Sequence, residues 1–305
     1  MQHVLNAAHR APARVTTQIR QLAERTLWVN VAPDANGVHN FTPALVEEFH
    51  ELIDEMRIPA AAAGAIGHPP PYAVIQSGHP TYFSQGGDLR FFLDCIKRRD
   101  AQRLRAYSMR CLDAIVAWST EFKGNMATIS LVQGRALGGG FELALAADHI
   151  IAEEQSSFGF PEIMFGLFPC SGAMGLLCER VAPKVAEKLM TNKKVYSAAQ
   201  LLEMGLVDEV VAQGTGELAV ERYIREHASR RKARMMVRQA VRRSAGIDPA
   251  EGRRVVEDWV EAAMQLAPEE VRAMEMLILM QAGEQGAAAA PSTPAAAGPA
   301  VARVA

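Results

Sequence analysis

Strand and helix patterns alternate along the first two-thirds of the chain, and this alternation limits the possible folds more than any other feature. Short segments rich in β-forming residues are typical of strands, and four occur: residues 26–31, 72–76, 127–132 and 149–152. Between them, Thr42 and Pro43 predict a helix start, residues 90–120 are mostly helical in pattern, and another helix begins near Phe141. This order predicts right-handed βαβ units in a layered α/β fold.

The character of the chain changes beyond Pro183. Ser197 and Gln200 resemble a capping box, and residues 214–280 are almost entirely helical in pattern. The last residues are Ala, Pro, Gly and Ser with few bulky apolar side chains, so we expect disorder there. Four parts are predicted: an N-terminal segment (1–24), an α/β core (25–212), a C-terminal helical section (213–281) and a disordered tail (282–305).

Composition excludes several classes of protein. The chain has 305 residues and a formal net charge of −2, so charge gives no general case for nucleic-acid binding. No apolar run approaches the roughly 20 residues that span a bilayer, and residues 1–18 lack the pattern of a secretory signal. The four cysteines match no zinc spacing. We therefore expect a cytoplasmic protein with reduced thiols, no metal and no other cofactor.

Three consecutive glycines, Gly138, Gly139 and Gly140, lie between an apolar strand and an apolar helix. Glycine opens backbone angles that are closed to other residues and lets a ligand approach the main chain. The unpaired N–H groups at the helix start lie at the positive end of the helix dipole, where they favour a developing negative charge. A tight turn that allows helix and sheet to pack closely explains the triplet equally well. The spacing matches neither a Rossmann fingerprint nor a phosphate-binding P-loop.

Glu142 and Glu162 are the candidate acid and base. Glu142 follows the glycines within an apolar run, and Glu162 follows Pro161 between large apolar residues. A carboxyl group among buried residues has a raised pKa unless it is paired, which suits proton exchange near neutral pH. Taken alone, each glutamate fits a structural role at a helix start. Only the pair, together with the glycines, favours catalysis.

Other candidates are weaker. Gly86 and Gly87 offer a second N–H donor, because two donors usually flank a developing oxyanion. Asp88 is predicted to cap the following helix instead of reacting. Cys170 has no histidine placed near it by sequence and is interpreted as a small buried residue. His149, at the end of an apolar helix, is interpreted as structural.

Residues 230–243 interleave basic side chains with apolar ones at helical spacing. The ordinary interpretation is the solvent-exposed face of an amphipathic helix. The alternative is a surface that docks an acidic partner.

The order of these motifs resembles the crotonase (enoyl-CoA hydratase/isomerase) superfamily. The similar region covers roughly residues 25–212, and its most specific parts are residues 138–142 and 158–162. The resemblance implies a layered ββα spiral core with a C-terminal helical section. It implies that Glu142 and Glu162 are an acid–base pair acting on the C2–C3 bond of an acyl thioester. It also implies that the backbone N–H groups of Gly87 and Gly139 form an oxyanion hole.

Within this superfamily the chain is more similar still to the diffusible signal factor synthases. Four stretches carry that likeness: residues 27–45, 87–92, 162–169 and 258–263. The resemblance implies dehydration of a 3-hydroxyacyl thioester on acyl carrier protein to a cis-2-enoyl chain. It also implies thioester hydrolysis, which releases a fatty acid that acts as a quorum-sensing signal.

Two other functions fit parts of the pattern. An enoyl-CoA hydratase of fatty-acid degradation shares the glutamate pair and takes acyl-CoA, although residues 40–45 differ from the Asn-Ala-Leu segment of many CoA-binding relatives. A non-catalytic regulator keeps the fold and binds a sensor protein, but it has no need of Glu142 and Glu162. Contact with a sensor kinase or receptor is compatible with an enzyme as well. The superfamily resemblance implies a homotrimer or a dimer of trimers.

Overall fold

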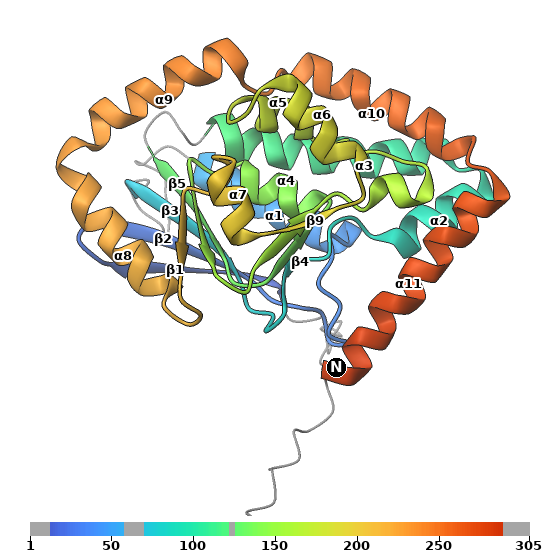
Figure 1. Ribbon diagram of the computed structural model, residues 1–305, viewed down its shortest axis with the longest axis horizontal. Helices are drawn as coiled ribbons and strands as arrows, with labels where there is room; N and C mark the ends of the chain where they lie inside the picture. The colour runs from blue at the N-terminus through green and yellow to red at the C-terminus, as the bar shows by residue number, and fades with distance from the viewer. Residues whose placement is uncertain (1–12, 58–69, 122–125, 289–305) are drawn as a thin grey trace, which may run out of the picture.

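The computed structural model describes residues 13–57, 70–121 and 126–288. Its centre is a six-stranded sheet in the order β1-β2-β3-β5-β7-β10 (Figure 1). β1 pairs with β2 antiparallel, and the other neighbouring pairs of this sheet are parallel. The strands are β1 (Val15–Gln21), β2 (Arg25–Val31), β3 (Tyr72–Ser77), β5 (Ala127–Val132), β7 (His149–Glu153) and β10 (Glu209–Val211).

A smaller sheet of four short strands adjoins the first, in the order β4-β6-β8-β9. The two pairs made by β6 are parallel, and β8 pairs with β9 antiparallel. This sheet places the turn after β6 close to the segment after β8, and those two segments carry the glycine triplet and Glu162. Its strands are β4 (Tyr82–Ser84), β6 (Arg135–Leu137), β8 (Ser157–Gly159) and β9 (Val195–Ser197).

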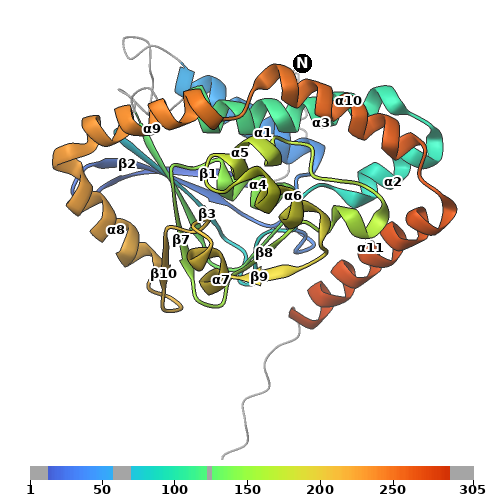
Figure 2. The same ribbon diagram turned by 45° about the horizontal axis from the view of Figure 1, so that its top comes forward.

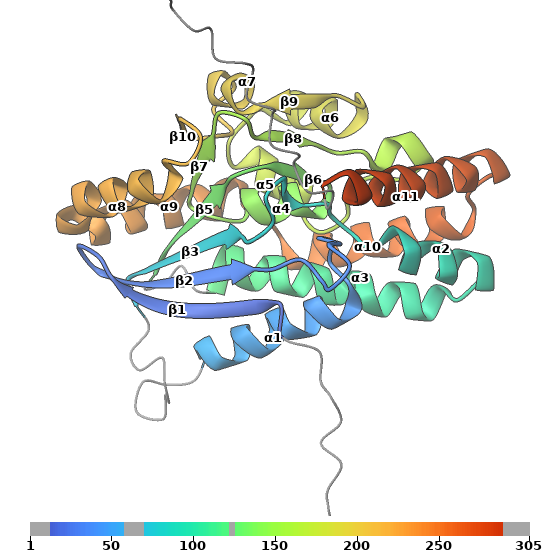
Figure 3. The ribbon, with the colours of Figure 1, turned by 90° about the horizontal axis from the view of Figure 1, so that it is seen from below.

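Helices cover both faces of the main sheet. One face and the surrounding helices bury the larger apolar core, and Figure 3 shows α1 and α3 running along this side. On the other face, Ala219, Val220 and Ile224 of α8 pack on strand residues such as Trp28 and Ile129. The helices of the first part are α1 (Pro43–Arg57), α2 (Leu89–Arg98), α3 (Ala101–Val116) with the π-helical turn η1 (Ala117–Glu121), α4 (Gly139–Leu145), the 3₁₀ helix η3 (Glu162–Phe165) and α5 (Ala173–Cys178).

The C-terminal part of the chain is helical. α8 and α9 lie at one end of the molecule, α10 runs across its top along α3, and α11 lies at the opposite end (Figures 1 and 2). No described helix is long and apolar enough to cross a membrane. The remaining helices are α6 (Pro183–Thr191), α7 (Ala198–Glu203), α8 (Gly216–His227), η4 (Ala228–Arg230), α9 (Arg231–Ala245), α10 (Pro249–Met264) and α11 (Pro268–Ala288).

The layered α/β fold with a helical C-terminal section is confirmed. Asp88 caps α2 by accepting from two backbone N–H groups, and Ser197 with Gln200 forms the predicted capping box. Two predicted boundaries differ from the structure. The main sheet begins at Val15, within the segment that we set apart before residue 25. α11 continues to Ala288, past residue 281. The rest of the predicted disordered tail, residues 289–305, lies outside the described residues.

Candidate active site

Glu142 lies in the first turn of α4, where the glycines before it set the course of the chain. Gly138 has a φ of +52°, and the helix begins at the next residue. Glu142 is buried, with only 2 % of its surface exposed. Its Oε1 atom accepts hydrogen bonds from the backbone N–H groups of Ser171, at 2.8 Å, and Ala173, at 3.1 Å. The segment between β8 and α5 therefore holds this carboxyl group in one orientation.

Glu162 is the first residue of η3 and approaches the glycine triplet from the smaller sheet. Its Oε1 atom touches the backbone of Gly138: a Cβ atom built there would lie 2.3 Å from it. Its Oε2 atom is shielded from solvent and has no hydrogen-bond partner among the described residues. Glu162 as a whole is half-buried, so the shielded atom faces the interior. The two glutamates thus differ: Glu142 accepts from two backbone N–H groups of another segment, whereas the backbone donor that acts on Glu162 is its own N–H.

Burial raises the pKa of both carboxyl groups. For Glu142, loss of solvent raises the pKa to about 7, and the hydrogen bonds from Ser171 and Ala173 oppose this rise. For Glu162, loss of solvent and then the charge of Glu142 raise the pKa to about 8. Because two nearby carboxylates repel, the charge of Glu142 favours the protonated form of Glu162.

Two backbone N–H groups converge beside the glutamates. A Cβ atom built at Gly139 would lie 3.7 Å from the Gly87 nitrogen, so these two amides are neighbours. Within the described part of the chain, neither N–H donates a hydrogen bond to another residue. Gly86, with a φ of +86°, lets the two segments meet: a Cβ atom there would lie 2.5 Å from the carbonyl oxygen of Leu137. The arrangement suits an oxygen atom that carries negative charge.

One apolar pocket, here called the main pocket, contains all four groups. Gly87, Gly139, Glu142 and Glu162 lie on its wall, and the empty space including its opening to solvent is about 800 Å³. Apart from Ser108, Ser171 and the groups just named, apolar and aromatic side chains and the thiols of two cysteines form most of the wall. These residues are Phe41, Val46, Phe49 and Ile53 near α1, Phe92, Tyr107, Cys111, Ala114, Ile115 and Trp118 of α2, α3 and η1, and Leu143, Phe168, Cys170 and Trp259.

A second pocket, here called the side pocket, meets the main pocket at Gly87, Phe92 and Glu162. These three residues line both pockets, whereas Gly139 and Glu142 line the main pocket alone. The side pocket lies between the smaller sheet and α11, with Arg135 and Leu277 on its wall. Gly87 and Glu162 therefore lie at the boundary of the two pockets, whereas Gly139 and Glu142 belong to the main pocket.

Sequence reasoning missed several residues of the main pocket. Trp259 arrives from α10, and no motif places that helix over the site. Cys111 lies one turn after Tyr107 on α3 and was predicted only as a helix residue. Cys170 does line the pocket, but burial raises the pKa of its thiol well above the usual range, so it is not an activated nucleophile.

His149 lies outside the main pocket. Its ring stacks on Tyr223 with 4.0 Å between the ring centroids, and its Nδ1 atom is 3.7 Å from Asp208. Among the described residues, no cluster of three or more His, Cys, Asp or Glu side chains has the arrangement of a metal site.

A sequence model of the family "Enoyl-CoA hydratase/isomerase" matches residues 50–261 of the chain. Two curated relatives illustrate the similarity. The peroxisomal bifunctional enzyme of Danio rerio is 33 % identical over 157 residues, which are 52 % of this chain and 20 % of that protein. Carnitinyl-CoA dehydratase of Salmonella paratyphi A is 34 % identical over 142 residues, which are 46 % of this chain and 51 % of that protein. The matched segment thus spans between a fifth and about half of these relatives.

The fold is also shared with solved structures. The crystal structure of enoyl-CoA hydratase from Bacillus halodurans superposes with a TM-score of 0.70 at 21 % identity, over 86 % of this chain and 99 % of that one. At this identity the likeness concerns the fold, and it agrees with the layered sheets and the helical C-terminal part described above.

Proposed function

Because the chain belongs to the enoyl-CoA hydratase/isomerase family, we propose that it adds water to, or removes water from, the C2–C3 bond of an acyl thioester. The observation that carries this proposal is the main pocket, where two buried carboxyl groups and two unpaired N–H groups share one apolar wall. An apolar pocket suits a fatty acyl chain, since each buried methylene contributes ~0.8 kcal/mol. Carboxyl groups with raised pKa values suit proton transfer at neutral pH.

The order of groups along the two pockets supports a direction for the substrate. The carrier arm lies in the side pocket, and the acyl chain extends into the main pocket. The thioester carbonyl then accepts from the N–H groups of Gly87 and Gly139, and C2 follows beside Glu162. C3 comes next, beside Glu142, which lines the main pocket alone.

The proton positions give each glutamate a role. In hydration, the Glu142 carboxylate takes a proton from water as the water oxygen bonds to C3. Negative charge then moves to the thioester oxygen, which the two N–H groups stabilise. Glu162 gives its proton to C2 and completes the 3-hydroxyacyl thioester. Dehydration is the reverse: Glu162 takes the C2 proton, and Glu142 protonates the departing hydroxyl group.

A finer proposal concerns the carrier and the fate of the product. The four stretches that resemble diffusible signal factor synthases converge on the main pocket: Phe41, Phe92, Phe168 and Trp259 come one from each. This convergence supports a 3-hydroxyacyl chain on acyl carrier protein as the substrate. In the second step, a glutamate takes a proton from water as the water oxygen bonds to the same carbonyl carbon. The C–S bond then breaks, the sulfur takes up a proton, and the cis-2-enoic acid and the carrier thiol are released as two separate products. The same N–H groups stabilise the tetrahedral oxyanion of that step.

Hydration of an acyl-CoA thioester, without hydrolysis, is the second candidate function. The names of the similar proteins refer to CoA thioesters, which supports a hydratase of acyl-CoA. Both readings use the same pocket and glutamates, so they differ only in the carrier and in hydrolysis.

One experiment separates the two readings. The full chain is incubated with 3-hydroxyacyl thioesters of acyl carrier protein and of CoA, and with crotonyl-CoA, and the products are measured by mass spectrometry. Free 2-enoic acid from the carrier-protein thioester supports the synthase. Hydration of crotonyl-CoA without hydrolysis of any thioester contradicts the synthase and supports the hydratase. No reaction with any of these thioesters contradicts both.

A further inference from the structure

A groove separate from both pockets lies between the main sheet and the α8–α9 pair. It shares no lining residue with the main pocket or the side pocket. We call it the α9 groove, and its wall includes Arg230, Arg231, Arg234 and Arg238 of η4 and α9. These arginines belong to the basic stretch at residues 230–243, for which the sequence allows two interpretations. One is a solvent-exposed helix face, and the other is a docking surface.

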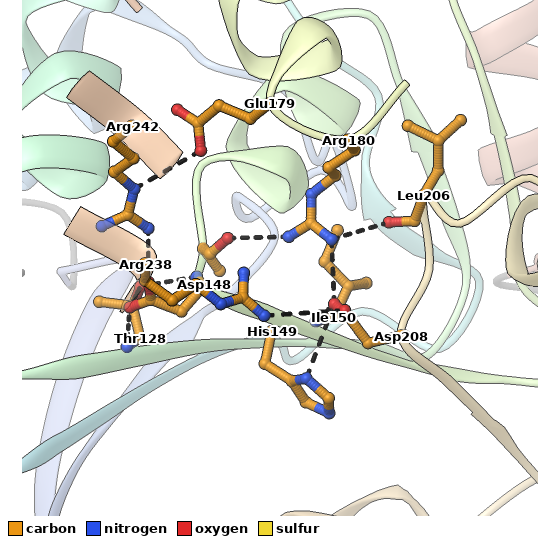
Figure 4. A network of polar contacts seen from close by, with 11 residues as sticks. Thr128, Asp148, His149, Ile150, Glu179, Arg180, Leu206, Asp208, Arg238 and Arg242 are labelled. Atoms are coloured by element: carbon orange, nitrogen blue, oxygen red, sulfur yellow. Dashed lines mark hydrogen bonds and ion pairs between the residues drawn. The ribbon is translucent and has the colours of Figure 1, made fainter. Parts of the chain in front are cut away.

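Most of the carboxylates in this groove are already paired with cations from outside it. Figure 4 shows Asp148 with Arg242, and Asp208 with Arg180 at 3.0 Å. Asp148 also accepts hydrogen bonds from Thr128, and Asp208 accepts from the backbone N–H of Ile150. These carboxylates are therefore neutralised and held in place.

Four arginines and four carboxylates line the groove, but most of the carboxylates are paired with cations from outside it. Glu209 pairs with Arg222, another cation outside the lining, which leaves Glu226 as the lining carboxylate without a cation partner among the described residues. Within the same residues, Arg230 and Arg234 form no ion pair, and Arg238 lies 3.8 Å from Asp208. An anionic ligand would give Arg230 and Arg234 a partner.

A buried hydroxyl group at the groove is also unpaired. Tyr72, at the start of β3, is 1 % exposed, and its Oη atom has no hydrogen-bond partner among the described residues. The charges that act on this hydroxyl are those of Arg231, Glu24 and Arg234. A buried polar group without a partner is costly, so a ligand oxygen that accepts from Tyr72 would stabilise the folded protein.

Aromatic side chains give this wall a fixed shape. The rings of His149, Tyr223 and His227 form a column, with 4.0 Å and 4.1 Å between neighbouring centroids. The Nε2 atom of His149 is shielded from solvent and also lacks a hydrogen-bond partner among the described residues. Donors on a rigid wall lose little entropy on binding.

We propose that the α9 groove binds the phosphate group of a small phosphorylated metabolite, with Arg230 and Arg234 facing the charge and the Tyr72 hydroxyl donating to an oxygen. Arginine suits this ligand because its planar group donates two parallel hydrogen bonds to a phosphate. The buried hydroxyl of Tyr72 favours a small solute over a flat charged surface, which could not reach it.

The test uses the full chain and inorganic pyrophosphate as the probe, measured by isothermal titration calorimetry at low salt. We expect saturable binding that Arg234→Ala weakens at least tenfold and Tyr72→Phe weakens three- to tenfold. Arg243→Ala removes the same charge from an exposed position of α9 outside the groove, and we expect less than a twofold change. Circular dichroism and hydration activity check that each variant keeps the native fold.

Three results would overturn the proposal. The first is no saturable binding. The second is an equal loss in Arg234→Ala and Arg243→Ala, which would indicate general attraction to a basic helix. The third is binding to phosphatidylglycerol vesicles, but not to pyrophosphate, that depends on the exposed Met236 and Val237 and not on Tyr72, since a membrane surface would then be the ligand.

Discussion

The Oε1 atom of Glu162 lies where a side chain at position 138 would begin, because a Cβ atom built on Gly138 would be 2.3 Å away. The same glycine has a φ of +52° and immediately precedes α4, which carries Glu142. Gly138 therefore has two roles. Its positive φ directs the chain into the helix that carries Glu142, and its lack of a side chain leaves space for the carboxyl group of Glu162. The glycine triplet and the glutamates are one structural unit.

Gly138→Ala is expected to lower the hydration rate by ~10²-fold or more, since it displaces a group proposed to transfer a proton. The matched control is Gly205→Ala, where φ is +78° but nothing lies within 4 Å of the added methyl group. Both variants should lose ~1–3 kcal/mol of stability from backbone strain. Steady-state rates and urea unfolding measure the two effects, and an equal loss of rate in the control would contradict this account.

The buried carboxyl groups predict that stability falls as pH rises. Their pKa values are about 7 and about 8 in the folded protein, above the ordinary value of 4.5. Between pH 4.5 and 8 the unfolded chain releases protons that the folded chain retains, so the free energy of unfolding decreases and then levels off. Below pH 4.5 the two carboxyl groups hold their protons in both states, so their contribution to the free energy of unfolding is fully present.

Neutral replacements test this pH effect. Relative to the native chain, the double variant Glu142→Gln, Glu162→Gln should gain stability at pH 8.5 and show little change near pH 4. Urea unfolding at several pH values measures the difference. An unchanged difference across the range would contradict the raised pKa values. Glu203→Gln, at an exposed position of α7, serves as the control and should show no such trend.

The wall of the main pocket predicts the preferred acyl length. Ala114 lies one turn beyond Cys111 on α3, and its replacement by Leu fills space along the chain path. Each methylene that no longer fits should lower kcat/KM about fourfold, from ~0.8 kcal/mol per methylene. Four-carbon substrates should react as before. Ala106→Leu, on the exposed side of the same helix, should leave the chain-length profile unchanged, and a shift in that control would contradict the proposed path.

The ion pair of Arg242 and Asp148 predicts how α9 is held. Their side chains are 11 % and 10 % exposed, and Asp148→Asn leaves Arg242 with only Glu179, which is 3.5 Å from its Nε atom. We expect a loss of up to ~3 kcal/mol in urea unfolding. In the control, Asp113→Asn breaks a pair with Arg253, whose side chain is 54 % exposed, and should cost less than ~1 kcal/mol. Similar losses in the two variants would contradict a structural role for the buried pair.

Local patterns were enough to predict the long elements and the glycine turn. The strands at 26–31 and 127–132 and the helix from Pro43 are recognisable because apolar spacing and caps lie within one segment. The smaller sheet was not predicted, since each of its strands has three residues and periodicity needs more. β1 was missed for another reason: its side chains are largely exposed or half-buried, so it lacks an apolar face.

The candidate site shows the same division between local and distant contacts. Glu142 and Glu162 were identified from their own short motifs, and the structure places both on the main pocket. Trp259 and the pairing of Ser171 with Glu142 depend on segments far apart in the chain, which no local pattern reports. The raised pKa values likewise come from burial, from hydrogen bonds and from the charge of a neighbouring carboxylate, and none of these is visible in a local pattern.

The most direct test of the glutamate roles is hydration of crotonyl-CoA in D₂O, with mass spectrometry of the 3-hydroxyacyl product. The native chain should place one deuterium on C2, delivered by Glu162, at a rate at least ~10²-fold above that of Glu142→Gln or Glu162→Gln. A native rate of deuterated product in the double variant would contradict the central claim that these two carboxyl groups exchange protons with the substrate.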